Sequence, residues 1–292
     1  MSYEKTPINT VNRKANKANY EVDVVHRIVN AASVLHVSFV PDVYDPLPVI
    51  LPMIGFVGAY PGGAQNTQSK SDDEKEAAAA AAAAAVAAAA EPCVWLHGYT
   101  SSRFFKQATK ESGPEADDDE DPTETDAGLP VCLAATLVDG LVLSLTPNSH
   151  SLNFQSAILH GRAHLVRDER ERLWAMQAIT DHVLPGRWAQ TRTPPNGAER
   201  SSTKILKVRI ASASAKIRAA EPADERADLG REDVLQSVWT GVVPMHTVYG
   251  EPVQSSYNRV KEVPANIGEF IKRRNEEGEA YARSVATKAP PK

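Results

Sequence analysis

Residues 96–106 read LHGYTSSRFFK, and hydroxyl and cationic side chains follow a short apolar run in this stretch. The overlapping CVWLHG predicts a strand, and TSSRFFKQATK predicts a helix that begins soon after the strand ends. A helix start offers unpaired backbone N–H groups and the positive end of the helix dipole. A serine at this position caps the helix and still presents its hydroxyl. The junction therefore gathers the kinds of group that bind an anion.

The two cations in this stretch suit a phosphate monoester, which carries about −1.5 to −2 charges near neutral pH and presents three acceptor oxygens. Arg103 offers a planar fork for two oxygens, and Lys106 follows three residues later on the same helical face. Ser101 or Ser102 would cap the helix and offer a hydroxyl. In the alternative interpretation, the serines only cap the helix and both cations are solvated. The residue types alone leave both interpretations open.

The elements that would position this junction are mainly β. Asp139 and Gly140 lie between two apolar runs and predict a two-residue hairpin. Such a turn needs positive φ at its central residues, which Asp-Gly adopts readily. Helices are predicted at 20–31, from Asp168 onward, and at 265–285. About seven or eight strands, mostly antiparallel, with few helices favour a small closed or partly split β-barrel. The predicted strands are 34–40, 49–53, 93–98, 131–146, 156–166, 202–211 and 237–245.

The chain is expected to form one domain with two insertions. Residues 1–19 are polar and predict a flexible N-terminal arm, 20–262 a single split-barrel domain, and 263–292 a C-terminal helix and tail. Within the domain, a polar and alanine-rich stretch at about 61–91 and an acidic stretch at about 112–128 interrupt the strand pattern. Both are predicted to be disordered insertions between strands.

The composition of the 292 residues narrows the class of protein. The formal net charge of −5 is set by the run EADDDEDPTETD, and no dense basic face remains, which argues against a nucleic-acid partner. The N-terminus lacks an apolar signal core, and no non-alanine apolar run approaches the ~18 residues of a membrane span. Cys93 and Cys132, the two cysteines, are expected to be buried thiols of a reducing compartment. We therefore expect a cytoplasmic protein without a membrane partner.

Other polar clusters give weaker signals. His160 and His164 flank a glycine in HGRAH, but four residues of a strand span about 13 Å, too far for one metal ion. We therefore predict no metal site. His150 lies beside serines in NSHS without a nearby carboxylate to orient it, and a polar loop explains it. No G-x-G-x-x-G or Walker A sequence occurs, so the common nucleotide-binding loops are absent.

Several motifs occur in order over most of residues 13–285, outside the two insertions. They are VLHVSFV with ILPMIG, LHGYTSSRFFK, LPVCLAATLVDGLVLSLTPNSHSLNFQSAILHGRAHLV, ITDHVLPGRW, SSTKILKVRI, SAKIRAAEPADE and VWTGVVPMHTVYGEPVQSSYNRVKEVP. With these motifs the chain resembles the pyridoxamine 5'-phosphate oxidase-like, FMN-binding split-barrel family. Within that family it is similar to the branch related to nitroimidazole-resistance proteins, and closest to the fungal members.

The resemblance implies a mainly β, FMN-binding split β-barrel with flanking α-helices, assembled as a homodimer with two FMN sites at the interface. Ser102, Arg103 and Lys106 would hold the FMN phosphate. His97 would lie near the isoalloxazine or ribityl chain, and Trp239 is the tryptophan expected to touch the flavin. The full set expected to contact the cofactor is His97, Gly98, Thr100, Ser101, Ser102, Arg103, Lys106 and Trp239.

Three positions depart from the family pattern. Phe154 and Gln155 stand where many relatives carry the tyrosine and arginine of an N-Y-R stretch. Ala220 stands where relatives often have glycine. Any cofactor contacts from these two segments are therefore in doubt.

The resemblance makes an FMN-dependent oxidoreductase the leading hypothesis, in which the flavin passes hydride or electrons from NADH or NADPH to a small oxidised acceptor. The sequence contains no evident proton donor or base, so it does not decide whether the protein is an enzyme. A second hypothesis is a non-catalytic flavin or haem protein used for storage or sensing, with His97 or His150 as the axial ligand of a haem. A third is an interaction protein whose insertions bind partners.

Overall fold

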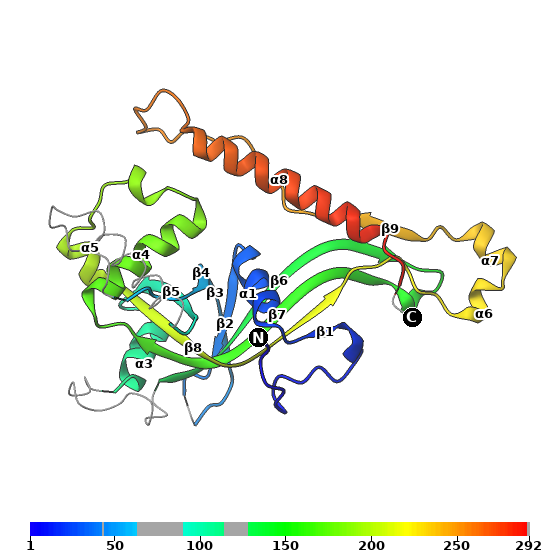
Figure 1. Cartoon of the computed structure of the whole chain (residues 1–292), viewed down its shortest axis with the longest axis horizontal. Coiled ribbons are helices and arrows are strands. Elements are labelled where there is room, and N and C mark those ends of the chain that lie inside the picture. Colours follow the sequence, from blue (N-terminus) through cyan, green and yellow to red (C-terminus); the bar gives the residue numbers. More distant parts are fainter. Residues whose placement is uncertain (43, 63–89, 114–127, 291–292) are drawn as a thin grey trace, which may run out of the picture. The chain divides into compact units, whose positions relative to one another are not determined.

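The computed structural model describes residues 1–42, 44–62, 90–113 and 128–290. In these residues the chain forms an antiparallel sheet of nine strands with flanking helices (Figure 1). The sheet runs in the order β3-β2-β6-β7-β8-β5-β4, and β1 pairs with β8 and β9 with β6. The strands are β1 (Ala18–Asn19), β2 (Leu35–Phe39), β3 (Val49–Met53), β4 (Gly55–Gly58), β5 (Cys93–Tyr99), β6 (Leu129–Leu143), β7 (Ser151–Leu165), β8 (Thr203–Arg218) and β9 (Gly241–Pro244).

The long helices occur where the sequence predicts them, and most of the two expected insertions lies outside the described residues. Asp168 caps α4 because its carboxylate accepts a hydrogen bond from the Glu171 backbone N–H at 2.7 Å. Among the described residues, no helix combines the length and apolar composition needed to span a membrane. The helices are α1 (Val22–Ala31), α3 (Arg103–Glu111), α4 (Glu169–Val183), α5 (Gly197–Ser202), α6 (Arg226–Leu229), α7 (Glu232–Ser237) and α8 (Ala265–Ala286), with 3-10 turns η1 (Ala15–Lys17), η2 (Pro147–Ser149) and η3 (Trp188–Gln190).

The chain divides into two compact units. Strands β6, β7 and β8 each pass from one unit into the other. The strand–helix junction at 96–106 belongs entirely to the first unit. The first unit comprises Met1–Thr10, Glu21–Ala135 and Ile158–Ala213, and the second comprises Val11–Tyr20, Thr136–Ala157 and Ser214–Lys292.

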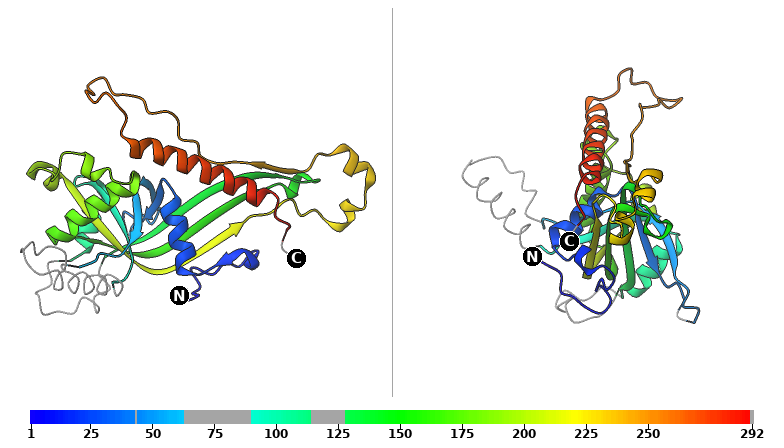
Figure 2. Two further views of the ribbon diagram at one scale, coloured as in Figure 1. Left: turned by 45° about the horizontal axis from the view of Figure 1, so that its top comes forward. Right: turned by 90° about the vertical axis from the view of Figure 1, so that its right-hand side faces the viewer.

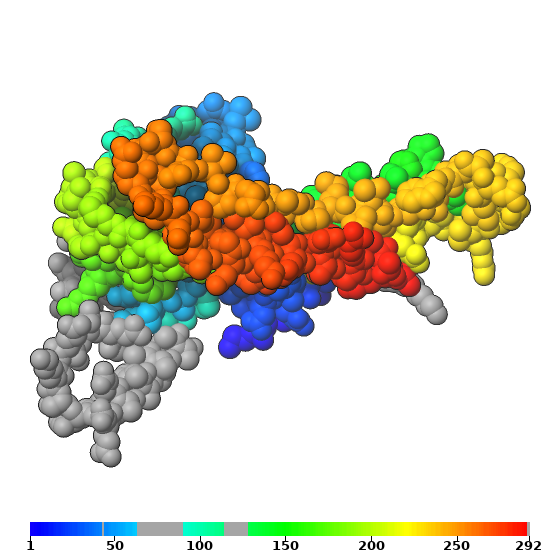
Figure 3. Space-filling model, turned by 90° about the horizontal axis from the view of Figure 1, so that it is seen from above, coloured from blue at the N-terminus to red at the C-terminus, as the bar shows by residue number. Residues whose placement is uncertain are grey.

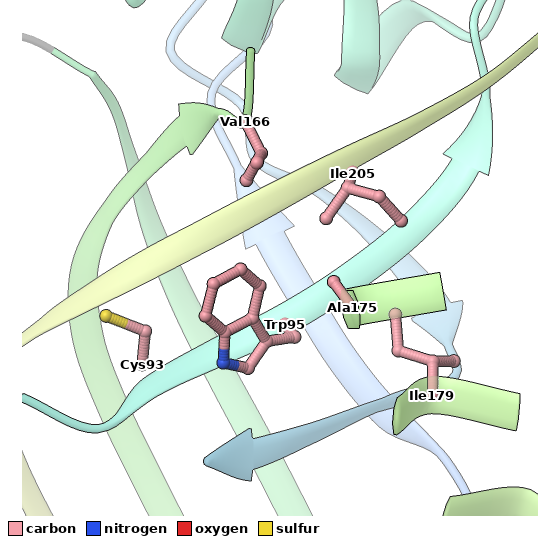
Figure 4. Close-up of a cluster of buried hydrophobic side chains, with 6 residues drawn as sticks. All are labelled: Cys93, Trp95, Val166, Ala175, Ile179 and Ile205. Atoms are coloured by element: carbon pink, nitrogen blue, oxygen red, sulfur yellow. The ribbon is translucent and has the colours of Figure 1, made fainter. Parts of the chain in front are cut away.

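The core of the first unit includes the contact between α4 and β5 (Figure 4). Trp95 of β5 is 1% exposed, and its indole N–H donates to the backbone oxygen of Gly58 at 2.8 Å. Trp174 of α4 meets the Trp95 ring edge to face, with the ring centroids 4.9 Å apart. These contacts fix β5 against both β4 and α4. The fully buried cluster consists of Cys93, Trp95, Val166, Ala175, Ile179 and Ile205.

The first residues of the chain, in the segment expected to be an arm, make specific contacts within the first unit. Asn9 is 2% exposed, and its side-chain amide donates to the backbone oxygen of Ala213 at 3.0 Å. The hydroxyl of Tyr3 lies 2.7 Å from Nε2 of His26 on α1. The start of the chain is thereby connected to β8 and to α1.

The predicted hairpin at Asp139 and Gly140 is wrong. β6 continues through both residues to Leu143, and Gly140 pairs with Pro244 of β9. The Asp139 carboxylate is buried and accepts a hydrogen bond from the Gln155 amide at 3.3 Å. Both partners lie far along the chain, so long-range pairing overrides the local turn signal of Asp-Gly.

The second unit contains the C-terminal helix. α8 packs against β9, which pairs with β6 (Figure 2). The strand predicted at 237–245 is shorter than expected, because α7 includes Ser237 and β9 begins only at Gly241. Trp239 lies in the connection between them, and its ring covers Gly241 so closely that a Cβ there would lie 2.7 Å from the ring.

A buried arginine organises the end of β8 in the second unit. Arg218 is 8% exposed, and its guanidinium donates to the side-chain oxygen of Asn153 and to the backbone oxygens of Ala220 and Glu221. Asn153 is fully buried, and its oxygen also accepts from the Ala220 backbone N–H at 3.1 Å. One amide oxygen therefore serves two donors, of which one is charged.

Replacement of that amide should destabilise the fold. We expect Asn153→Ala to lower the free energy of unfolding by about 2–3 kcal/mol, because the buried guanidinium loses an acceptor that it cannot replace with water. Urea denaturation followed by circular dichroism measures the change. The matched control is Asn148→Ala, at an exposed position, which should change the stability by less than about 0.5 kcal/mol. Equal stability of the two variants would contradict the role assigned to Asn153.

Candidate anion-binding site

The junction predicted at 96–106 forms a strand end followed by a helix start. β5 pairs with β8 along its whole length, with His97 opposite Ile205 and Tyr99 opposite Thr203. After the strand, the Thr100 backbone N–H donates to the backbone oxygen of Ser202 at 2.9 Å. The turn that follows is therefore held to the chain that enters β8.

Helix α3 starts where the sequence predicts, with Ser102 as its N-cap. The Ser102 hydroxyl accepts from the Phe105 backbone N–H at 3.5 Å, a long contact. Phe104 and Phe105 are 1% and 2% exposed, and Phe104 packs on Phe39 of β2 with centroids 4.9 Å apart. These two rings are the anchor of α3. Arg103 and Lys106 consequently lie on its exposed side.

Gly98 makes this anchor possible. A Cβ atom at Gly98 would lie 2.3 Å from Cε2 of Phe105, well inside van der Waals contact. The Phe105 ring therefore occupies the space above the strand where any other residue would place its side chain. The reason for this glycine is a close approach of the ring to the backbone.

The candidate anion-binding groups of the junction have no protein partner among the described residues. Arg103 and Lys106 are exposed, and neither side chain has a hydrogen bond or ion pair in the described part of the chain. The backbone N–H groups of Ser101, Arg103 and Phe104 likewise have no acceptor among the described residues. Two cations and several free donors thus lie at the positive end of one helix.

Arg103 also lines a cavity of about 490 Å³ together with two carboxylates. Asp42 and Asp45 come from the connection between β2 and β3, and Asp42 also accepts from the Tyr44 backbone N–H at 3.0 Å. Sequence reasoning missed these residues. The sequence DVYDPLP contains both carboxylates, in the turn between the paired strands β2 and β3. That this turn lies near Arg103 follows from the packing of α3 on β2, which the sequence does not show.

His97 lies half-buried near the end of β5. Its Nδ1 atom is buried and has no hydrogen-bond partner. Burial lowers the pKa of His97 below its usual value, so the ring is neutral near pH 7. A neutral ring has one donor and one acceptor nitrogen, and Nδ1 is available for a ligand in either role.

Lys204 is a further cation that sequence reasoning did not select. It pairs with Gly98 across β5 and β8, and its ammonium donates to the Thr109 hydroxyl of α3 at 2.8 Å. This contact joins β8 to α3. Lys204 therefore supports the position of the helix.

Trp239 is not part of the junction. It belongs to the second unit, where it is 67% exposed. His150 also lies in the second unit, and its Nδ1 accepts from the Ser144 backbone N–H at 3.0 Å. Seven of the eight residues expected to contact the cofactor are thus brought together in sequence and space, and Trp239 belongs elsewhere in the chain.

Comparison with protein families identifies the class of protein. Residues 21–217 match the family described as Pyridoxamine 5'-phosphate oxidase. This match covers more than half of the chain, so the chain belongs to that family, as its sequence motifs indicated. The nitroimidazole-resistance branch and the fungal type remain predictions. A search of curated proteins gave no match.

Solved structures confirm the expected fold class, a mainly β split barrel with flanking helices. The flavocytochrome Anf3 from Azotobacter vinelandii is 23% identical, with a TM-score of 0.65 over 90% of this chain and 96% of that one. The FAD and heme binding protein from Mycobacterium smegmatis is 20% identical, with a TM-score of 0.62 over 87% of this chain and 97% of that one. At these identities the likeness concerns the fold alone.

The close approach at Gly98 leads to a prediction about the junction. We expect Gly98→Ala to push the Phe105 ring out of its place and lower the free energy of unfolding by about 1–3 kcal/mol. Thermal unfolding measures the loss, and the control is Gly197→Ala, because a Cβ at Gly197 has no atom within 4 Å. A Gly98→Ala protein as stable as the Gly197→Ala protein would show that Phe105 does not fix α3.

Proposed function

We propose that the chain is a flavoprotein that holds the phosphate of FMN at the junction of β5 and α3. The observation that carries the proposal is a pair of cations, Arg103 and Lys106, beside backbone N–H groups at a helix start, all without a protein partner in the described part of the chain. Membership of the pyridoxamine 5'-phosphate oxidase family supports it. So do the descriptions of the two neighbours in fold, a flavocytochrome and a protein that binds FAD and haem.

The side chains at the junction contact the phosphate in different ways. Arg103 pairs with two phosphate oxygens, and Lys106 adds a charge from the same exposed side of α3. The hydroxyls of Thr100 and Ser101 donate to the remaining oxygen. Ser102 caps the helix, so its hydroxyl is already partly used. The carboxylates that share the cavity of Arg103 repel the phosphate and oppose its binding here.

His97 fits the part of the ligand beyond the phosphate. Its buried Nδ1 has no hydrogen-bond partner among the described residues, which destabilises the fold unless a ligand or water hydrogen-bonds to it. Its lowered pKa keeps the ring uncharged, so it can hydrogen-bond a neutral polar edge without adding charge. A bound flavin supplies hydride or electron transfer, and the protein sets its orientation and potential.

In the full proposal the protein is an oxidoreductase that takes electrons from NADH or NADPH and passes them to a small oxidised acceptor. The second candidate function is a protein that binds FAD or haem without catalysis. The descriptions of the two fold neighbours favour this alternative, as does His97 with its free ring nitrogen as an axial ligand. Steady consumption of NADH or NADPH with an acceptor separates catalysis from binding alone, and a Soret band in the absorbance of the purified protein distinguishes haem from flavin.

Removal of either cation should weaken FMN binding. We expect Arg103→Gln and Lys106→Gln each to raise the Kd for FMN by about 10–100-fold, the value of one charge-assisted hydrogen bond. Fluorescence titration of the stripped protein with FMN measures the Kd, with riboflavin as the ligand that lacks phosphate. The matched control is Lys110→Gln, an exposed lysine at the far end of α3, which should change nothing.

Removal of the carboxylates beside Arg103 should strengthen FMN binding. We expect Asp42→Asn with Asp45→Asn to lower the Kd for FMN, because removing negative charge from the cavity weakens its repulsion of the phosphate. Riboflavin binding should not change. An FMN affinity that none of these variants alters would exclude the junction as the phosphate site.

The proposal includes a homodimer, and the second unit carries the surface that would form it. We name this surface the apolar segment, residues 238–263, part of which is visible in orange in Figure 3. Its large apolar side chains are between 36% and 95% exposed, and a concentration of exposed apolar side chains favours an interface. They are Val238, Trp239, Val243, Met245, Val248, Val253, Tyr257, Val260 and Val263.

Charges placed on this segment should prevent dimerisation. We expect the wild-type protein to be a dimer by light scattering, and Val253→Asp with Tyr257→Asp to be a monomer, because burying two carboxylates is costly. The control is Tyr44→Asp in the first unit, where the side chain is 94% exposed and outside the segment. A wild-type monomer, or a double variant that still dimerises, would contradict the assignment.

A further inference from the structure

A second cavity lies beside α4 in the first unit, with a volume of about 700 Å³. It shares no lining residue with the junction of β5 and α3 or with the cavity of Arg103. Its volume lies within the range of small-molecule sites, about 300–1,000 Å³. Neither the family match nor the proposed phosphate site assigns it a role. The residues that decide its chemistry are Tyr60, Arg170, Trp174, Gln177, Trp188 and Pro194.

The walls of this cavity are flat and rigid. Trp174 is held by edge-to-face contact with Trp95 at 4.9 Å and by a tilted contact with Tyr60 at 5.3 Å. Trp188 is fixed through its backbone, because its N–H donates to the Asp181 carboxylate at 2.8 Å and its oxygen accepts from Thr191. Its indole ring has no aromatic partner among the described residues. Such surfaces bind a planar ring at low entropic cost.

The uncompensated charge of the cavity is positive. At the start of α4, the carboxylate of Asp168 caps the helix and that of Glu171 pairs with Lys207 at 2.8 Å. Glu169 pairs with Arg172 at 2.7 Å. Arg170, between them, has no hydrogen bond or ion pair in the described part of the chain.

The position of Arg170 in its helix also makes the cavity positive. Arg170 is the second residue of α4, so the positive end of the helix dipole adds to its charge. Tyr60 is less acidic than usual, chiefly because burial raises its pKa, so it stays neutral and can donate a hydrogen bond. The side-chain amide of Gln177 adds both a donor and an acceptor at the cavity.

We infer that this cavity is a second ligand site, which binds a planar aromatic molecule carrying one carboxylate or similar anion. The ring lies between the indoles of Trp174 and Trp188, and the anion pairs with the guanidinium of Arg170. This inference does not depend on flavin binding, because no residue of the junction takes part in it.

The test uses 2-naphthoate as the probe and isothermal titration calorimetry as the measurement. We expect the wild-type protein to bind it, Arg170→Gln to weaken binding about tenfold, and Trp188→Leu to weaken it further. The neutral analogue 2-naphthamide should bind the wild-type protein about as weakly as 2-naphthoate binds Arg170→Gln. Circular dichroism verifies that each variant is folded. Arg170 is exposed and pairs with no described residue, so its replacement should leave the fold intact.

Two controls locate the effect. Arg226→Gln removes an exposed arginine in the second unit and should leave binding unchanged. Arg103→Gln should also leave it unchanged, whatever its effect on FMN, which separates this site from the proposed phosphate site. Absence of 2-naphthoate binding, equal affinity in Arg170→Gln, or equal affinity for 2-naphthamide would each overturn the inference.

Discussion

The packing of one phenylalanine ring on a bare stretch of backbone determines the geometry of the candidate site. Phe105 covers Gly98 at a distance that no side chain at that position would permit, and Phe104 beside it packs on Phe39. Both rings face inward together with Ala108, which leaves Arg103 before them and Lys106 after them on the exposed side of the helix. The exposed positions of Arg103 and Lys106 are a consequence of this packing, not of any attraction between the cations and the protein. Their charges therefore remain available to a ligand.

The cavities of the first unit differ in how their charges are balanced. In the cavity of Arg103, two carboxylates accompany one guanidinium without pairing with it in the described residues, so their negative charge opposes the binding of an anion. Beside α4, each acidic group already has a partner, and the arginine is left with an excess positive charge. Electrostatics in these sites is thus decided by which neighbours are already paired, more than by the number of charges.

The sequence predicted the junction because its signals are local. The apolar run, the serine cap and the helical spacing of the cations all lie within a dozen residues, and α3 begins at the expected place. The capped start of α4 was predictable for the same reason. The predicted hairpin was wrong because Asp139 hydrogen-bonds to Gln155 and Gly140 pairs with β9. The residues next to Asp139 and Gly140 in the sequence do not indicate either contact. Asp42 and Asp45 were missed since only the contact between α3 and β2 brings them to Arg103.

The two thiols of the first unit differ in how far they are enclosed. Cys93 is buried in the cluster under α4, whereas Cys132 on β6 is partly accessible. Burial raises the pKa of both thiols, so little of the reactive thiolate is present at neutral pH. An alkylating reagent would therefore reach Cys93 only when the buried cluster around it opens, and the rate of its modification would report how often this part of the core opens.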